Sequence, residues 1–211
     1  MYLQNITLII IVITCVISIL AFSNEKLVNS LIFNPYLILK ENQYYRLFTS
    51  GFIHADWSHL IFNMLSFYFF GRNVSFTFNE IFGPVVGPSL FVLLYLVGIA
   101  FSDFPSLIAH KNSRTFYSLG ASGGVSSIIY ASIMFYPLDK IYFFIIPFGI
   151  PGFVYGILYL IYCSYAPGNF QKNINHSAHL WGSIVGVVFT IIAYPPVVQS
   201  FIEQIASWKV F

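Results

Sequence analysis

A serine and two histidines, each near the start of an apolar segment, are the residues of this chain best suited to chemistry. Ser122 lies among small residues (118–125, SLGASGGV) at the head of an apolar run that reaches Tyr136. His179 begins another such run, and His59 and Asn63 share one helical face of a third at the i,i+4 spacing. A histidine in hydrogen-bond reach of a serine removes its proton and makes it a nucleophile. The pattern predicts Ser122 as nucleophile and His179 as base.

The oxyanion that forms when a serine attacks a carbonyl needs fixed hydrogen-bond donors. His59 and Asn63 can supply side-chain donors, and the backbone N–H of Ser122 can add to them at the start of its helix. Asp56, Asp103 and Asp139 all fall outside the segment of His179. The expected arrangement is therefore a serine–histidine dyad with no orienting carboxylate.

These polar groups are expected at one depth of a membrane. Ser122 precedes Pro137 by fifteen residues, which is roughly 22 Å of helix in a hydrocarbon core about 30 Å thick. His179 precedes the next proline by sixteen residues, and His59 precedes Arg72 by thirteen. If the three segments run in the same direction, the groups share one level. A serine among glycines in a membrane helix is usually a packing residue, but polar groups converging at depth mark function.

The composition is that of an integral membrane protein. Of 211 residues 58% are hydrophobic and 8% charged, with a mean hydropathy of +0.80, whereas soluble domains average about a quarter charged residues. A net charge of +2 is too small to suggest a nucleic-acid partner. Cys15 and Cys163 both fall in apolar runs and are expected to be core or lipid-facing residues.

The chain is expected to form one all-α domain with six membrane spans. These cover residues 6–22, 57–71, 85–101, 120–136, 141–162 and 178–194. The first is expected to be a retained helix, because it lacks the basic leader and cleavage site of a signal peptide. Residues 23–53 are expected to form a long interfacial loop with short helices, and residues 197–211 an amphipathic tail at the membrane surface. Pro147 and Pro151 should kink or break the fifth span.

Small residues are expected to bring the fourth and sixth spans together. Gly182 and Gly186 fall on the same helical stripe as His179, and Gly120 and Gly123 lie beside Ser122. Small residues spaced by one turn let membrane helices approach closely. This approach would bring Ser122 next to His179.

Three stretches together resemble the rhomboid intramembrane serine proteases. They are residues 54–63 (HADWSHLIFN), 120–123 (GASG) and 178–186 (AHLWGSIVG), and the resemblance extends from about Tyr44 to Tyr194. It implies a rhomboid-type six-helix bundle, Ser122 as nucleophile, His179 as base, and an oxyanion site of His59, Asn63 and the Ser122 N–H. His54 would be a structural histidine near the opening. Tyr45 and Arg46 resemble the aromatic–arginine pair of the family's first loop.

The resemblance also implies partners and location. Substrates would be transmembrane segments of other membrane proteins, with lipids around the protein and no cofactor, metal or nucleic acid. The expected location is a bacterial inner membrane, with the amino terminus in the cytosol. The charge count opposes that orientation, because the basic residues of the odd-numbered loops (Lys26, Lys40, Arg46, Lys111, Arg114, Lys172) outnumber those on the other side (Arg72, Lys140, Lys209).

One position departs from the family pattern. Many rhomboids carry an aromatic residue one turn after the serine, stacked on the base, and here that residue is Ser126. Trp181 or a ring from the fifth span is expected to restrain His179 instead. The fifth span and the loop over residues 164–175 are also expected to form the substrate gate, because their prolines and glycines weaken the helix.

Other functions are less compatible with the sequence. No histidine is followed by glutamate as in H-E-x-x-H metalloproteases, and the three aspartates are badly placed for an aspartyl protease. No internal repeat suggests a transporter. A rhomboid-like factor that binds membrane clients without cutting them remains the alternative.

Overall fold

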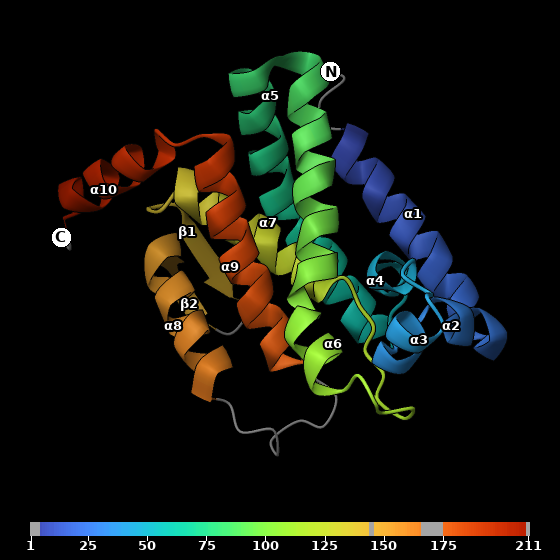
Figure 1. Cartoon of the computed structure of the whole chain (residues 1–211). Coiled ribbons are helices and arrows are strands. Elements are labelled where there is room, and N and C mark those ends of the chain that lie inside the picture. The colour runs from blue at the N-terminus through green and yellow to red at the C-terminus, as the bar shows by residue number, and fades with distance from the viewer. Residues whose placement is uncertain (1–4, 144–145, 166–174, 210–211) are drawn as a thin grey trace.

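The computed structural model is a predominantly helical bundle with one small β-hairpin (Figure 1). It describes residues 5–143, 146–165 and 175–209. The helices are α1 (Asn5–Phe22), α2 (Glu25–Leu31), α3 (Pro35–Lys40), α4 (Arg46–Thr49), α5 (Trp57–Ser102), α6 (Phe104–Ala109), α7 (Ser122–Phe135), α8 (Gly152–Tyr165), α9 (His176–Ala193) and α10 (Val197–Ser207), with a 3-10 turn over Ser50–Phe52. The strands are β1 (Lys140–Phe143) and β2 (Ile146–Pro151).

Length and hydropathy make two helical stretches of the described chain candidates for membrane spans. They are Trp57–Ala109 and His176–Ala193, while α1, α7 and α8 are apolar but shorter. The outward faces of these helices carry large apolar side chains, such as Val12, Leu158 and Ile192. In a membrane protein such faces meet lipid, which removes the need for a polar surface.

Helix α5 turns back on itself at Gly83, whose φ of 82° lies in the left-handed region that favours glycine. The two limbs run antiparallel in Figure 1, and Phe67 of the first packs against Phe91 and Tyr95 of the second, with ring centroids 5.7 and 4.7 Å apart. The first limb extends well past Arg72, so that residue does not end the helix. Arg72 is exposed, and an arginine on an outer face does not interrupt a helix.

Helix α7 forms the centre of the bundle. Eleven of its fourteen residues are buried, whereas only five of the eighteen residues of α9 are. It packs against the second limb of α5 through Gly98 and Gly124, where an added β-carbon would collide with Ser127 and with Ile99. Helix α9 covers another side of α7, again through glycines.

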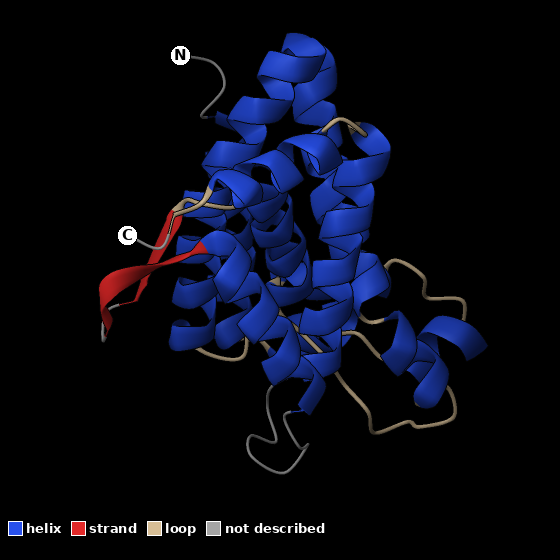
Figure 2. Ribbon diagram, turned by 90° about the vertical axis from the view of Figure 1, so that its left-hand side faces the viewer, coloured by secondary structure: helices blue, strands red, loops and turns tan. Residues whose placement is uncertain are grey.

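The stretch expected as the fifth span, residues 141–162, is not a single helix. Residues 140–151 form the antiparallel β1–β2 hairpin, with Lys140 opposite Pro151 and Ile141 opposite Ile150 (red in Figure 2), and α8 begins only at Gly152. The physical reason is that prolines cannot donate helix hydrogen bonds, whereas β-branched and aromatic residues between them favour strand. The expected break at the prolines is thus present, but strand replaces helix before it.

Residues 23–53 fold into short helices rather than an open loop. Buried Arg46 holds them together, because its Nη1 donates to the carbonyl oxygens of Asn29 (2.8 Å) and Ile32 (2.9 Å). Phe33 exchanges two backbone hydrogen bonds with Ser118. This segment therefore supports the backbone that leads into α7.

Helix α10 extends from the end of α9 away from the bundle (Figure 1). It is fixed by buried Val197 and by a bond of 3.1 Å from Gln204 Nε2 to the Phe135 carbonyl at the end of α7. Its other side presents apolar residues such as Ile202 to the surroundings. A position at the membrane surface stays a prediction for this helix.

Candidate active site

Ser122 is the first residue of α7, and the backbone before it is tightly held. Gly120 adopts a φ of 116° and donates its N–H to the Ser50 carbonyl at 2.9 Å. Ala121 donates its N–H to Nε2 of His54 at 3.3 Å. Ser122 is half-buried and begins the first turn of a helix, where N–H groups have no acceptor inside the helix. The serine is therefore presented at a fixed helix N-terminus, next to free backbone donors.

His59 lies directly against this N-terminus. A β-carbon added to Gly120 would be 2.5 Å from Cε1 and 2.7 Å from Nε2 of His59. Only a glycine at position 120 leaves room for the His59 ring. Gly120 precedes Ser122 by two residues, so the ring lies close to the serine. Asp56 fixes the start of α5 by accepting the His59 N–H at 2.8 Å, and Asn63 is buried one turn later, with its Nδ2 donating to the His59 carbonyl at 3.0 Å.

Helix α9 carries His179 and meets α7 backbone to backbone. An added β-carbon at Gly182 would collide with the Gly123 carbonyl oxygen, and one at Gly186 would collide with that of Ser127. The two contacts have the same residue offset, 182 − 123 = 59 and 186 − 127 = 59, so the helices run parallel in one register. In that register Ser122 is level with residue 181. This is two residues from His179, or about 3 Å along the axis.

The N-terminus of α9 is anchored by Asn175. Its side-chain oxygen accepts the Ala178 N–H at 3.0 Å and caps the helix, while its Nδ2 donates to Asp103 Oδ1 at 2.8 Å. The same Nδ2 lies 3.4 Å from the hydroxyl of Ser118, in the segment that leads to Ser122. One asparagine thus connects the start of α9 with the end of α5 and the approach to α7.

The imidazole of His179 is bonded to α8. Its Nδ1 is 2.9 Å from the hydroxyl of Tyr159, and the two ring planes are 23° apart. Its Nε2 makes no hydrogen bond to a described residue, and Ser122 and His179 are not hydrogen-bonded to each other in the described chain. The structure thus brings the two side chains to one end of the α7–α9 contact without joining them. Trp181, the other ring expected to restrain the base, is 43% exposed.

His54 is a buried histidine behind the serine helix. Its Nδ1 lies 2.9 Å from Ser18 Oγ of α1, and that hydroxyl also donates to the Phe52 carbonyl at 2.9 Å. Since Nε2 accepts the Ala121 N–H, Nδ1 must carry the proton of a neutral imidazole. Burial lowers the pKa of His54 to about 3, with a smaller lowering from nearby His59 and an opposing effect of Asp56. His54 therefore fastens the backbone before Ser122 to α1.

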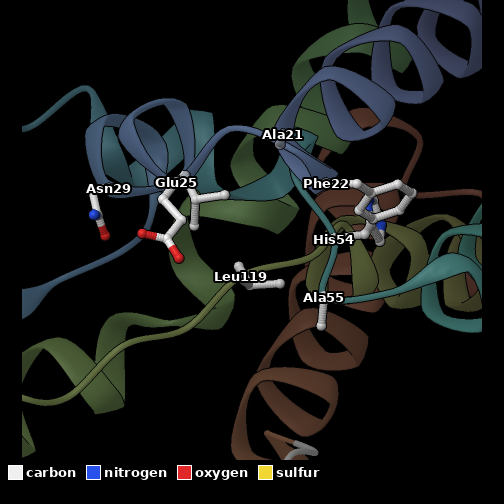
Figure 3. A pocket seen from close by; sticks show the side chains of 8 residues that line it. Ala21, Phe22, Glu25, Asn29, His54, Ala55 and Leu119 are labelled. Carbon is white, nitrogen blue, oxygen red and sulfur yellow. The ribbon is translucent and has the colours of Figure 1, made fainter.

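A cavity of about 440 Å³ opens beside His54, between the end of α1, α2 and the segment before α7 (Figure 3). Glu25 and Asn29 line its polar side, and Phe22 and Leu119 its apolar side. Its lining residues belong to α1, α2 and the segments that precede α5 and α7. In the described residues no group of three or more His, Cys, Asp or Glu side chains is arranged to hold a metal ion.

Several residues of this site gave no sequence signal of their own. Ser18, Asn175 and Tyr159 act across distances of 20 to 72 residues along the chain, and each type is common in membrane helices or at their caps. His176 was also missed, although its ring lies between those of Tyr162 (5.3 Å) and His179 (6.4 Å). These residues can be identified only from their distance in space to a partner on another helix, and a single sequence does not give that distance.

Comparison with known proteins agrees with the resemblance on which the site was predicted. The family model for the Rhomboid domain matches residues 41–196. The chain is similar to "RHOMBOID-like protein 12, mitochondrial" of Arabidopsis thaliana, at 30% identity over 71% of this chain and 46% of the relative. It is also similar to "Rhomboid protein 1, mitochondrial" of Saccharomyces cerevisiae, at 29% identity over 66% of this chain and 39% of the relative.

The matches thus span less than half the length of either relative. Both names refer to mitochondria, so they give the expected bacterial inner membrane no support. Members of this family are membrane proteins, in keeping with the composition and the apolar outer faces of the helices. The helical fold and the family match over residues 41–196 together show that this chain belongs to the rhomboid family.

Proposed function

We propose that the protein is an intramembrane serine endopeptidase that cuts other membrane proteins in or near their transmembrane segments. The observation that carries the proposal is the parallel register of α7 and α9. Backbone contact at Gly182 and Gly186 leaves Ser122 and His179 within about 3 Å of one level. A packing role for Ser122 would not require a histidine at that level on the neighbouring helix.

The proposed reaction uses the Ser122 hydroxyl and Nε2 of His179, the ring nitrogen that is not bonded to Tyr159. Ser122 Oγ attacks the carbonyl carbon of the scissile peptide bond while His179 Nε2 takes its proton. His179 then returns this proton to the leaving amine, and a serine ester remains on the enzyme. Water hydrolyses the ester with the same histidine as base. The Ser122 N–H, His59 and Asn63 are the proposed donors to the oxyanion in both steps.

Six spans are proposed for the membrane domain. The two limbs of α5 count separately, and α1, α7, α8 and α9 complete the set. Helix α7 has fourteen residues, which is about 21 Å of helix in a core about 30 Å thick. If its C-terminal end reaches one membrane surface, Ser122 at its start stays inside the membrane. A peptide bond cut at that depth belongs to a transmembrane segment or its flank.

Entry of the substrate is proposed to occur beside α8. Its outward face is exposed, and its start is weakened by the prolines of the hairpin. Most of the expected gate loop, residues 166–174, lies outside the described residues. Because a protease must bind extended backbone, substrates with helix-weakening residues near the cut should be preferred.

The second candidate is a rhomboid-like factor that binds membrane clients without cutting them. The observation in its favour is that Ser122 and His179 are not hydrogen-bonded to each other in the described chain. A site without cleavage would still hold an extended client, but it would have no use for a base.

The deciding experiment is cleavage of a reporter transmembrane substrate in liposomes. Wild-type protein should cut it, and Ser122→Ala and His179→Ala should each abolish cutting. Ser132→Ala, at a buried serine near the far end of the same helix, is the matched control and should cut normally. A fluorophosphonate should label the wild type and not Ser122→Ala. Unimpaired cutting by Ser122→Ala would refute the proposal, and folded wild-type protein that neither cuts nor labels would favour the binding factor.

A further inference from the structure

The hydrogen bond between Tyr159 and His179 fixes the orientation of the imidazole. The Tyr159 hydroxyl is 2.9 Å from Nδ1, and the ring centroids are 6.1 Å apart with planes 23° apart. With near-parallel planes at that centroid distance, the two rings form an offset stacked pair. A single bond in the ring plane prevents rotation of the imidazole about its χ2 torsion.

The same bond is compatible with either tautomer of the imidazole, because a tyrosine hydroxyl can donate or accept. A neutral imidazole has one N–H donor and one nitrogen acceptor, and only the acceptor can take a proton from serine. Because Tyr159 occupies Nδ1, Nε2 is the nitrogen left to act as the base, and in that proposed role Nδ1 carries the hydrogen. Tyr159 then accepts from Nδ1–H, and its own O–H needs another acceptor.

Ser126 is our candidate for that acceptor. Its side chain is buried and interacts with the Tyr159 hydroxyl, as does Cys163 one turn further along α8. The hydroxyl oxygen of Ser126 is the better acceptor of the two, because sulfur is a weak one. Ser126 lies one turn after Ser122 on α7.

Resting on the proposed function, we propose that Tyr159 is the positioning residue of the catalytic base. It accepts from Nδ1–H of His179, donates to Ser126, and thereby directs the Nε2 lone pair of His179 toward Ser122. The aromatic restraint is supplied by α8, a different helix from the one that carries the serine. Ser126 is in turn the residue that holds Tyr159 in place.

The simplest alternative is that this bond only fastens α8 to the bundle. Helix α8 has another such fastening, the bond of 2.6 Å from the Tyr130 hydroxyl to the Gly156 carbonyl. A fastening role predicts that loss of the Tyr159 hydroxyl weakens folding and leaves the turnover of folded enzyme unchanged. A positioning role predicts that the turnover of folded enzyme falls while folding is little changed.

The test is Tyr159→Phe, which keeps the ring and removes the hydroxyl. We expect kcat on the reporter substrate to fall about tenfold with KM unchanged, because the bond orients the base only for the chemical step. The rate of fluorophosphonate labelling should fall by a similar factor, since it needs the dyad but not the peptide substrate. Tyr165→Phe, at a residue of the same helix that is 81% exposed, is the matched control and should match wild type.

Ser126→Ala provides a second variant that leaves both rings intact. We expect kcat to fall about threefold, because the Tyr159 hydroxyl is then free to turn its hydrogen toward Nδ1. The double variant should be no slower than Tyr159→Phe, since Ser126 acts only through that hydroxyl. Rates are compared per folded molecule, so a loss of stability in one variant does not hide the result.

The outcomes separate the two proposals. Cutting that survives in Ser122→Ala would refute the proposed function itself. Cutting that depends on Ser122 but is equally fast in Tyr159→Phe and Ser126→Ala would overturn the role of Tyr159 alone. A rise in KM at constant kcat would also overturn it, because it would assign the hydroxyl to substrate binding.

Discussion

Replacing Gly182 with alanine tests the close contact of α7 and α9, on which the spacing of the proposed dyad depends. The added β-carbon would collide with the Gly123 carbonyl oxygen and lie 3.0 Å from the Gly123 α-carbon, whereas ordinary contact begins at 3.4 Å. The obstacle is backbone, which cannot turn aside as a side chain can. The two helices must therefore separate near Ser122 and His179.

The expected effect on activity exceeds the effect on stability. Overpacking costs about 1–3 kcal/mol, and the better helix propensity of alanine offsets about 1 kcal/mol of this. The helices must move apart by roughly 1 Å, and a misplacement of that size costs about 100-fold in rate. That factor corresponds to about 2.7 kcal/mol of transition-state stabilisation. Gly182→Ala should therefore fold but cut about a hundred times more slowly than wild type.

The assay is kcat on the reporter transmembrane substrate, with thermal unfolding measured on the same preparation. Gly156→Ala is the matched control, because its β-carbon would lie 3.4 Å from Ile133 Cδ1 and 3.5 Å from Tyr130 Cε1, which is ordinary contact. It should unfold at or above the wild-type temperature and cut at the wild-type rate. A Gly182→Ala protein with normal kcat would show that the spacing of α7 and α9 does not govern the reaction.

Three further predictions concern the backbone around the site. Since burial lowers the pKa of His54 from 6.5 to about 3, its neutral form stabilises the fold fully above about pH 6.5, and this stability is lost as the pH falls toward 3. His54→Asn should thus show a smaller acid-induced drop in unfolding temperature than wild type, and an equal drop would contradict this. Gly120→Ala should lower the free energy of unfolding by about 1–3 kcal/mol because of its positive φ, and slow cutting by displacing His59; both are measured on the same sample. Asn175→Ala should cost about 1 kcal/mol in chemical unfolding through loss of the α9 cap, with no cost meaning that the cap is dispensable.

Features that depend on local sequence could be predicted, and those that depend on a tertiary partner could not. The glycine stripe that carries His179 is visible in the sequence because helical periodicity alone places Gly182 and Gly186 on one face. The close approach to α7 at these two residues is what the structure shows. The ring that restrains His179 could be predicted from the sequence only as Trp181 or one of the rings of the fifth span.

Two differences between the expected helices and the observed backbone have a common physical origin. The charge of Arg72 predicts the end of a span at that residue. The apolar composition of residues 141–151 predicts that they belong to a spanning helix. Hydropathy does not decide backbone conformation in either case. An exposed arginine keeps its helix, which continues to the true break at Gly83, whereas two prolines among β-branched and aromatic residues give strand.

The distance and the orientation within the proposed dyad are controlled by different kinds of contact. The separation of Ser122 from His179 is set by backbone against backbone at Gly182 and Gly186, which no side-chain rotation can change. The orientation of the imidazole is set by one hydroxyl on α8, and that bond breaks if α8 moves by more than a fraction of its 2.9 Å length. If α8 opens to admit substrate, as proposed, the base loses its restraint while the gate is open and regains it on closure. Cutting would then require a closed α8 over bound substrate, which couples substrate entry to activation of the serine.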